Sequence, residues 1–247
     1  MLIAGLDLAA EPKGTALAVL DWSRSRVKLL SLEQNVQDQR IIDAASTLDK
    51  LGIDCALGWP VDFVDFLKRY SSESLAGEVF EGDIDWRRRL AHRETDREVH
   101  RVTGRWPLSV STDRLGMTAL RCAGLLSKLQ ASGTPIDRSG GGLVVEIYPA
   151  ASMRIWGLQI AGYRNSESIR SRLINNLKEA APWLELLGFE VQLVESCDAF
   201  DSVIAALAAG SAASGKSSRP PASKLAQAKV EGWVALPLTS VAELVSQ

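Results

Sequence analysis

Short apolar runs separated by turn residues open the chain. The first three runs cover residues 2–8, 14–20 and 26–32. Gaps this short suit hairpins, because a parallel connection between neighbouring strands needs about a dozen or more residues. The pattern therefore predicts a three-stranded antiparallel meander at the start of the chain.

Apolar residues at helical spacing follow over 34–51, and Gly52 provides a stop signal for that helix. The next apolar run, 53–57, is typical of a buried strand. A strand reached through a helix is most naturally parallel to one already laid down, with a right-handed crossover. We therefore expect this fourth strand to lie beside the first and parallel to it.

The strand and helix rhythm breaks down over about 61–140, where we expect a helical insertion with one basic face. Within it, segment 87–105 carries seven arginines against three acids, together with both histidines. The other predicted elements are a helix at 115–129, a strand at 143–148, a helix at 166–181, a strand at 189–194, an Ala-rich helix at 198–209, a surface loop at 210–223, a closing strand at 231–237 and a helix at 240–245.

Composition narrows the class of protein. The chain has 247 residues, 46% of them apolar, and a net charge of −2, which excludes a disordered chain and a globally basic nucleic-acid coat. No repeat or linker divides it, so we expect one α/β domain over residues 1–247. There is no apolar run of about 18 residues, no basic leader, and no metal-like spacing of the three cysteines. We therefore expect a cytoplasmic protein without a membrane partner, and the sequence leaves its oligomeric state open.

Carboxylates fall inside apolar segments, where a charge is costly unless it is paired or bound to a metal. Asp7 lies in the first predicted strand, Asp54 in the fourth and Glu146 in the next. Asp198 and Asp201, spaced i, i+3, share one face at the start of an otherwise apolar helix. Five acidic residues therefore need a partner.

A divalent cation is the partner that this pattern favours. Adjacent first and fourth strands would place Asp7 beside Asp54, and a helix at their carboxyl ends would add Asp198 and Asp201. Oxygen-only ligands suit Mg²⁺ or Mn²⁺, and two such ions about 4 Å apart stabilise an in-line phosphodiester displacement. The sequence therefore predicts a metal-dependent phosphodiester hydrolase with these four aspartates as ligands and Glu146 as a further one.

Structural explanations compete with this interpretation for single residues. Asp198 is well placed as a helix N-cap, and Asp54 could begin its strand at a wet edge. Glu146 could face solvent or pair with an arginine. Asp7 is the hardest to explain in this way, because apolar residues flank it on both sides.

Nucleic acid is the expected partner. Arginines of the insertion are candidate phosphate contacts, since a guanidinium group binds phosphate through two parallel hydrogen bonds. The alternative is a solvated helix face on which the arginines pair with neighbouring acids. An aromatic residue at a strand end offers a surface for stacking on a base. The candidate substrate-binding residues are Arg88, Arg93, Arg97, Arg101 and Tyr148.

Residues 210–217, GSAASGKS, match the phosphate-binding loop pattern GxxxxGK[ST]. That mechanism requires the loop to follow a strand and to open a helix. Here an Ala-rich helix precedes the pattern and two prolines follow it, so we reject the match.

Six blocks in order resemble domain-of-unknown-function family 429, whose members are predicted nucleases of the ribonuclease H-like fold. The blocks are GLDLAAEPKGT at 5–15, IDCALGWP at 53–60, RETD at 93–96, EIYPA at 146–150, DAFD at 198–201 and EGW at 231–233.

The resemblance implies a five-stranded mixed sheet, with three antiparallel strands followed by two parallel ones, flanked by helices. By analogy with RuvC-type Holliday-junction resolvases, it implies that the four aspartates bind the metal. The same analogy makes Glu146 and Asp96 auxiliary residues of the substrate cleft.

Two other functions remain open. A phosphotransferase of the actin or sugar-kinase fold also begins with a Gly-x-Asp strand, although that fold needs two duplicated domains. A non-catalytic binding protein of the same fold would hold its carboxylates too far apart to share a cation. The sequence does not distinguish DNA, RNA and small phosphoesters as substrates.

Overall fold

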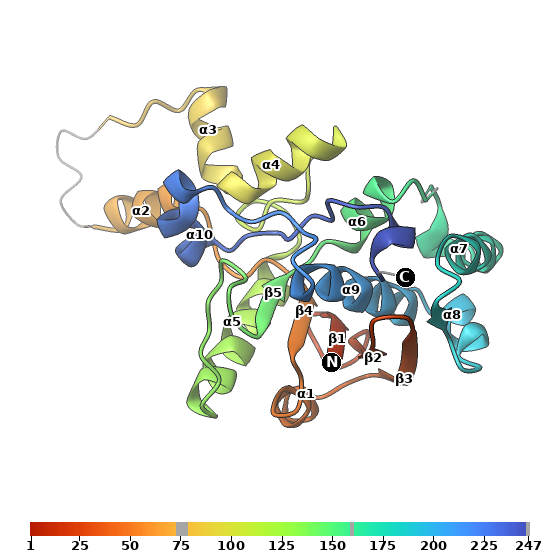
Figure 1. The fold of residues 1–247 in the computed structure, drawn as a ribbon. Coiled ribbons are helices and arrows are strands. Elements are labelled where there is room, and N and C mark those ends of the chain that lie inside the picture. Colours follow the sequence, from red (N-terminus) through yellow and green to blue (C-terminus); the bar gives the residue numbers. More distant parts are fainter. Residues whose placement is uncertain (73–78, 159–160, 246–247) are drawn as a thin grey trace.

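A mixed sheet forms the centre of the computed structural model, which describes residues 1–72, 79–158 and 161–245 (Figure 1). The strand order is β5-β4-β1-β2-β3-β6. β1 to β3 are antiparallel neighbours, whereas β4 is parallel to β1 and β5 is parallel to β4. The strands are β1 (Leu2–Asp7), β2 (Ala16–Trp22), β3 (Val27–Gln34), β4 (Lys50–Asp54), β5 (Val144–Glu146) and β6 (Leu184–Glu185). The predicted meander and the parallel pairing of the first and fourth strands are confirmed.

Helices cover both faces of this sheet. α9 and α7 pack on one face, and α1 and α5 pack on the other. The helices are α1 (Asp38–Ala45), α2 (Val61–Tyr70), α3 (Ile84–Ala91), α4 (Glu94–Thr103), α5 (Gly116–Ala131), α6 (Pro149–Ile155), α7 (Glu167–Ala180), α8 (Glu190–Glu195), α9 (Cys197–Ala213) and α10 (Leu225–Glu231), with short 3₁₀ turns η1 (Tyr163–Asn165), η2 (Ala222–Lys224) and η3 (Val241–Glu243).

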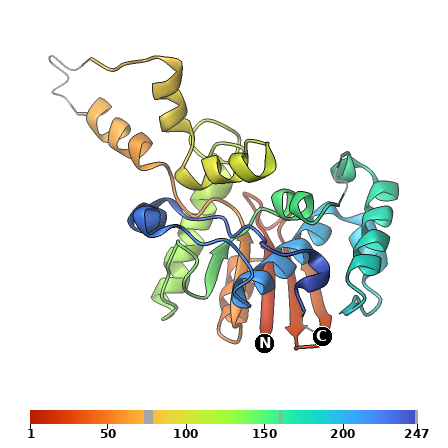
Figure 2. The same cartoon turned by 45° about the horizontal axis from the view of Figure 1, so that its top comes forward.

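The segment between β4 and β5 is helical, as expected of the insertion. α2 and α3 project from the body as a pair, and α4 lies over one end of the sheet (Figure 2). Residues 73–78 of the insertion lie outside the described residues. None of the helices in the described parts of the chain is long and apolar enough to cross a membrane.

α9 rests directly on β1 and β4. A Cβ atom built on Gly5 would lie 2.1 Å from the Ala206 nitrogen and 2.1 Å from the Ser202 carbonyl oxygen. One built on Gly52, the neighbour of Gly5 in the parallel pair, would lie 2.8 Å from the Ala209 Cβ. Two glycines on the sheet and small residues on the helix therefore allow this close approach.

Several predicted elements differ from the structure near the edges of the sheet. The sheet has six strands and not five, because the two-residue β6 joins its edge beside β3. The predicted strand at 189–194 is the short helix α8. Short apolar runs fit either a strand or a helix, and tertiary packing decides between them.

The boundaries of several elements also differ from the predicted ones. The predicted helix at 34–51 is only α1, because Lys50 already begins β4 and Asp54 ends it. The predicted closing strand at 231–237 contributes only isolated bridges, and residues 240–245 hold a single 3₁₀ turn. Gly210 belongs to α9 and not to a loop, and it packs on Trp22. Helix α6 was not expected.

We predict that Gly5→Ala lowers the free energy of unfolding by at least about 2 kcal/mol, because the added methyl group has to push α9 away from β1. Gly124→Ala is the matched control, since Gly124 lies within α5 with no neighbour within 4 Å of the added atom. The control should gain about 0.5–1 kcal/mol. Urea unfolding curves measure both changes. Equal stability of Gly5→Ala and the wild type would contradict the packing described for α9.

Candidate functional site

Two aspartates end neighbouring parallel strands at the same edge of the sheet. Asp7 is the last residue of β1 and pairs in register with Asp54, the last residue of β4. Side chains alternate along a strand, so Asp7 lies on the same face as Gly5, which contacts α9. The same alternation places Asp54 with Gly52. Both carboxyl groups are therefore on the face that α9 covers, and each keeps some exposure to solvent.

α9 begins beside this pair and supplies two more carboxyl groups. Its N-cap is Ser196, whose hydroxyl accepts a hydrogen bond from the Ala199 nitrogen at 3.1 Å. Asp198 is therefore not the N-cap, and its carboxyl group lies near the β1–β2 turn, 3.7 Å from a Cβ built on Gly14. Asp201, one turn further, is only 2% exposed.

Burial raises the pKa of all four carboxyl groups, and neighbouring carboxylates add to the shift for Asp7, Asp54 and Asp201. Burial raises the pKa of Asp7 well above its ordinary value, and the charges of Asp54, Asp201 and Asp198 add to this effect. Burial also raises the pKa of Asp54, and the charge of Asp201 is the next cause. Burial raises the pKa of Asp201 to about 6 and shifts the pKa of Asp198 in the same direction. The predicted aspartates thus form one electrostatic cluster.

Sequence patterns did not indicate two further residues of the cluster, Tyr163 and Arg164 in η1. The Tyr163 hydroxyl donates to Asp201 and lies 3.0 Å from Oδ1 and 3.1 Å from Oδ2. The Arg164 guanidinium is 3.8 Å from Asp201 Oδ2, and its charge lowers the pKa of all four aspartates. The Arg164 side chain is still 56% exposed. Arg164 therefore partly offsets the negative charge while remaining accessible to a ligand.

Arg170 of α7 holds η1 in place. Its buried guanidinium donates to the carbonyl oxygens of Tyr163 at 2.7 Å and Arg164 at 3.1 Å. It also donates to the carbonyl oxygen of Val194 at 2.7 Å and that of Glu195 at 3.2 Å, just before α9. One side chain thus connects the segment that carries Tyr163 to the start of the helix that carries Asp201.

A cavity of about 350 Å³ opens next to the cluster. Tyr148, the N-cap residue of α6 just after β5, lies on its wall, and burial followed by the charge of Asp54 raises the pKa of Tyr148. Asp198 and Asp201 are not among the residues found on its wall. Its charged and polar wall includes Asp7, Asp54, Arg93, Asp96, Thr118, Glu146, Tyr148 and Arg164.

The donor set fits a hard cation in its chemistry. Carboxylate oxygens are the ligands that Mg²⁺ and Mn²⁺ prefer, and a cation would relieve the repulsion within the cluster. In residues 1–72, 79–158 and 161–245, however, no three His, Cys, Asp or Glu side chains are gathered in a metal-holding arrangement. The donor atoms and the charge of the cluster therefore suit a hard cation, but the described side chains do not form a closed coordination shell.

The sequence profile of a family described as "Protein of unknown function (DUF429)" matches residues 5–225. The chain belongs to the DUF429 family. No curated protein and no solved structure matches the chain. The matched range begins in β1 and extends to the start of α10, so it contains the whole carboxylate cluster.

Several motif residues of this DUF429 protein meet in a buried network around Arg93. The Arg93 guanidinium donates to Asp96 at 3.2 and 2.8 Å and to Glu146 at 2.9 and 2.7 Å. Its remaining N–H donates to the Glu231 carbonyl oxygen at 3.0 Å. All five N–H groups are thereby used within the protein. Arg93, 4% exposed, therefore has no donor left for the phosphate contact that the sequence suggested.

Glu146 and Asp96 consequently have structural partners. Glu146 pairs with Arg93, and its Oε2 also accepts a hydrogen bond from the Leu57 nitrogen at 3.1 Å. Asp96 is fully buried and closes the capping box of α4 on Arg93. The arginine pair weighed for Glu146 is thus observed, and Glu146 also lies on the wall of the cavity beside Asp7. Asp96 lies on the wall of the cavity beside Asp7 while its carboxyl group pairs with Arg93.

The same network anchors the C-terminal segment. The Glu231 carboxyl group accepts hydrogen bonds from the Val61 nitrogen at 2.8 Å and the Glu94 nitrogen at 3.0 Å, which are the first residues of α2 and α4. The Thr95 hydroxyl accepts a hydrogen bond from the Val234 nitrogen at 2.7 Å. The blocks RETD, EIYPA and EGW therefore meet in space and hold the insertion against β5.

The other candidate arginines pair with acids three positions away on their own helices. Arg88 contacts Asp85 at 3.1 Å on α3, as expected for a solvated helix face. On α4, the Arg97–Glu94 and Arg101–Glu98 pairs each measure 2.6 Å. None of the three arginines is among the residues found on the wall of the cavity beside Asp7.

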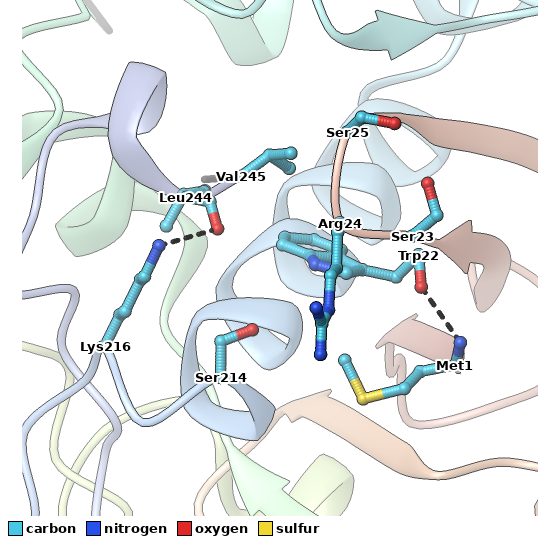
Figure 3. A pocket seen from close by; sticks show the side chains of 9 residues that line it. All are labelled: Met1, Trp22, Ser23, Arg24, Ser25, Ser214, Lys216, Leu244 and Val245. Carbon is cyan, nitrogen blue, oxygen red and sulfur yellow. Dashed lines mark hydrogen bonds between the residues drawn. The ribbon is translucent and has the colours of Figure 1, made fainter. Parts of the chain in front are cut away.

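A larger cavity, of about 800 Å³, lies at the opposite end of the sheet (Figure 3). There the Lys216 amine donates to the Leu244 carbonyl oxygen at 3.1 Å, and the Met1 amine donates to the Trp22 carbonyl oxygen at 2.9 Å. No carboxyl side chain is among the described residues on its wall. Size alone therefore does not identify the site of chemistry.

We predict that Arg93→Met lowers the free energy of unfolding by about 3–5 kcal/mol, because it leaves the buried Glu146 and Asp96 carboxyl groups without their cation. Arg101→Met is the matched control, since Arg101 pairs with Glu98 on the surface of α4. The control should unfold at nearly the wild-type denaturant concentration. Guanidinium chloride unfolding compares the two variants, and equally small losses would mean that the network does not hold the insertion.

Proposed function

We propose that this DUF429 protein is a ribonuclease H-like phosphodiester hydrolase that acts on nucleic acid with Mg²⁺ or Mn²⁺. One observation carries the proposal. Asp7 and Asp54 lie in register on parallel strands under a helix that brings Asp201 to them, and all three carboxyl pKa values are raised. Carboxyl groups kept close together against their own repulsion are typical of a functional site.

The strand order supports the fold part of the proposal. The order β3-β2-β1-β4-β5, antiparallel up to β1 and parallel after it, agrees with the arrangement that the family resemblance implied. β6 only extends the edge beside β3. In this arrangement the carboxyl ends of β1 and β4 lie at the centre of the sheet, where a substrate meets both aspartates at once.

Asp7 and Asp54 would hold the cation, together with Asp198 or Asp201 from α9. A bound divalent cation supplies stabilisation of the charge that develops on the phosphodiester oxygens during the displacement. Tyr163 orients the Asp201 carboxyl group by donating a hydrogen bond to it. The half-buried Asp198 lies at the exposed end of the cluster.

In this proposal Arg164 contacts the substrate phosphate, in place of the arginines of the insertion from which the sequence led us to expect that contact. It lines the cavity, lies next to Asp201 and keeps much of its guanidinium accessible. An incoming phosphate would therefore find a cation where the four carboxyl groups alone would repel it. Tyr148 lines the same cavity and offers a ring for stacking on a base.

We predict that the purified protein cleaves labelled oligonucleotides in millimolar Mg²⁺ or Mn²⁺ and that Asp7→Asn lowers the cleavage rate at least about 100-fold. Single-stranded and duplex DNA, RNA and a four-way junction are the substrates to compare by gel electrophoresis. Asp43→Asn is the matched control, because it removes an exposed carboxyl group on α1, on the other face of the sheet.

Three results would contradict the proposal. Equal cleavage by the wild type and Asp7→Asn would assign the activity to a contaminant. Phosphate transfer from ATP in place of cleavage would favour the kinase-like alternative. Metal-independent binding of oligonucleotides without cleavage would favour a non-catalytic member of the fold.

A further inference from the structure

A third cavity, of about 700 Å³, also lies at the end of the sheet opposite the carboxylate cluster. Its wall includes Lys50, the first residue of β4, and Ala213, the last residue of α9. The glycine-rich turn at 140–142 and residues of the segment that follows α9 complete it. The cavity thus contacts the far ends of the same two elements that carry Asp54 and Asp201.

Lys50 is a buried cation in this cavity without a carboxylate partner. It is 7% exposed, and its amine donates to the carbonyl oxygens of Gly140 at 2.8 Å and Gly142 at 2.5 Å. Within the described parts of the chain, no carboxylate oxygen lies within 4.0 Å of its nitrogen. Burial lowers the pKa of Lys50, and the charge of Arg219 lowers it further while Asp137 opposes both. A buried charge in such surroundings is costly until an anion joins it.

Two more cations line the same cavity. Arg219, in the segment after α9, and Lys229, on α10, are exposed, and the side chain of neither makes a hydrogen bond or an ion pair with any described residue. The two acids of the wall already have partners. Asp49 accepts a hydrogen bond from the Leu2 nitrogen at 2.7 Å, and Asp137 accepts two from Ser139, at 2.9 and 2.6 Å. Basic side chains therefore outnumber acidic ones on this wall by three to two, although the whole chain carries a net negative charge.

The glycine turn adds donors to the wall. The backbone N–H groups of Gly141 and Gly142 have no acceptor among the described residues. A Cβ built on Gly141 would lie 2.5 Å from Asp137 Oδ2, so a side chain there would collide with the acid that orders the turn. Free N–H groups beside unpaired cations are the donors that phosphoryl oxygens accept from.

We propose that this cavity binds a small phosphoryl-bearing anion, as free phosphate or pyrophosphate or as the phosphate end of a nucleotide. Its volume lies within the range of small-molecule sites, about 300–1,000 Å³, and leaves room for more than one phosphoryl group. The guanidinium of Arg219 offers two parallel donors, and Lys50 and Lys229 add positive charge. The site goes beyond the proposed hydrolase activity, because it lies at the other end of the sheet from a cluster that would repel anions.

Calorimetric titration of inorganic pyrophosphate into metal-free protein tests the proposal. Wild type should bind it saturably, and Arg219→Ala/Lys229→Ala should weaken binding at least about tenfold, since two charge-assisted contacts are lost. The matched control is Arg172→Ala/Lys178→Ala, which removes the same charge from the surface of α7. It should bind as tightly as the wild type. Asp7→Asn should also bind normally, which separates this site from the proposed hydrolase activity.

Titrations of ADP and of phosphate distinguish the source of the phosphoryl group. Tighter binding of ADP than of pyrophosphate would assign the site to a nucleotide, and equal or weaker binding would assign it to the free anion. Absence of saturable binding for all three probes would overturn the proposal. An equal loss in both double variants would overturn it as well, since net charge alone would then explain the effect. Binding of an oligonucleotide but of none of these small probes would also overturn it.

Discussion

The repulsion among four carboxyl groups is the constraint on which the candidate site depends. Their mutual repulsion favours a larger separation of the carboxyl groups of Asp7, Asp54, Asp198 and Asp201. They stay together because α9 lies directly on β1 and β4, at a distance that Gly5 and Gly52 permit. The packing energy of an apolar helix on a sheet therefore opposes an unfavourable arrangement of charge, as is typical of functional sites.

Two buried arginines support the surroundings of this cluster in different ways. Arg93 uses every N–H group of its guanidinium to join α4, β5 and the last residue of α10, and so it fixes one wall of the cavity beside Asp54. Arg170 donates to four backbone carbonyl groups and so fixes the turn that carries Tyr163 and Arg164. Neither contacts the cluster as a ligand would. Both keep its neighbours in place.

The meander, the parallel fourth strand and the pairing of Asp7 with Asp54 could be predicted, because hydrophobic period and connection length determine them locally. The two-residue strand β6 and the helix α8 could not be, since their short patterns fit more than one structure and packing decides. Sequence spacing also cannot distinguish a charge that faces a cavity from one that faces a buried partner. Arg93 and Glu146 therefore resembled site residues, whereas Tyr163 and Arg164, in a segment without periodicity, gave no signal.

Unfolding of the metal-free protein and of Asp201→Asn as a function of pH tests the central claim most directly. The folded state binds a proton at Asp201 with a pKa of about 6, above the value of about 4 in the unfolded chain, so the stability of the wild type should fall as pH rises through this interval. Asp201→Asn should match the wild type near pH 4 and exceed it by roughly 1–3 kcal/mol at pH 7.5. Millimolar Mn²⁺ should then stabilise the wild type more than the variant. Lower stability of Asp201→Asn at pH 7.5, with no difference in the response to Mn²⁺, would contradict the account.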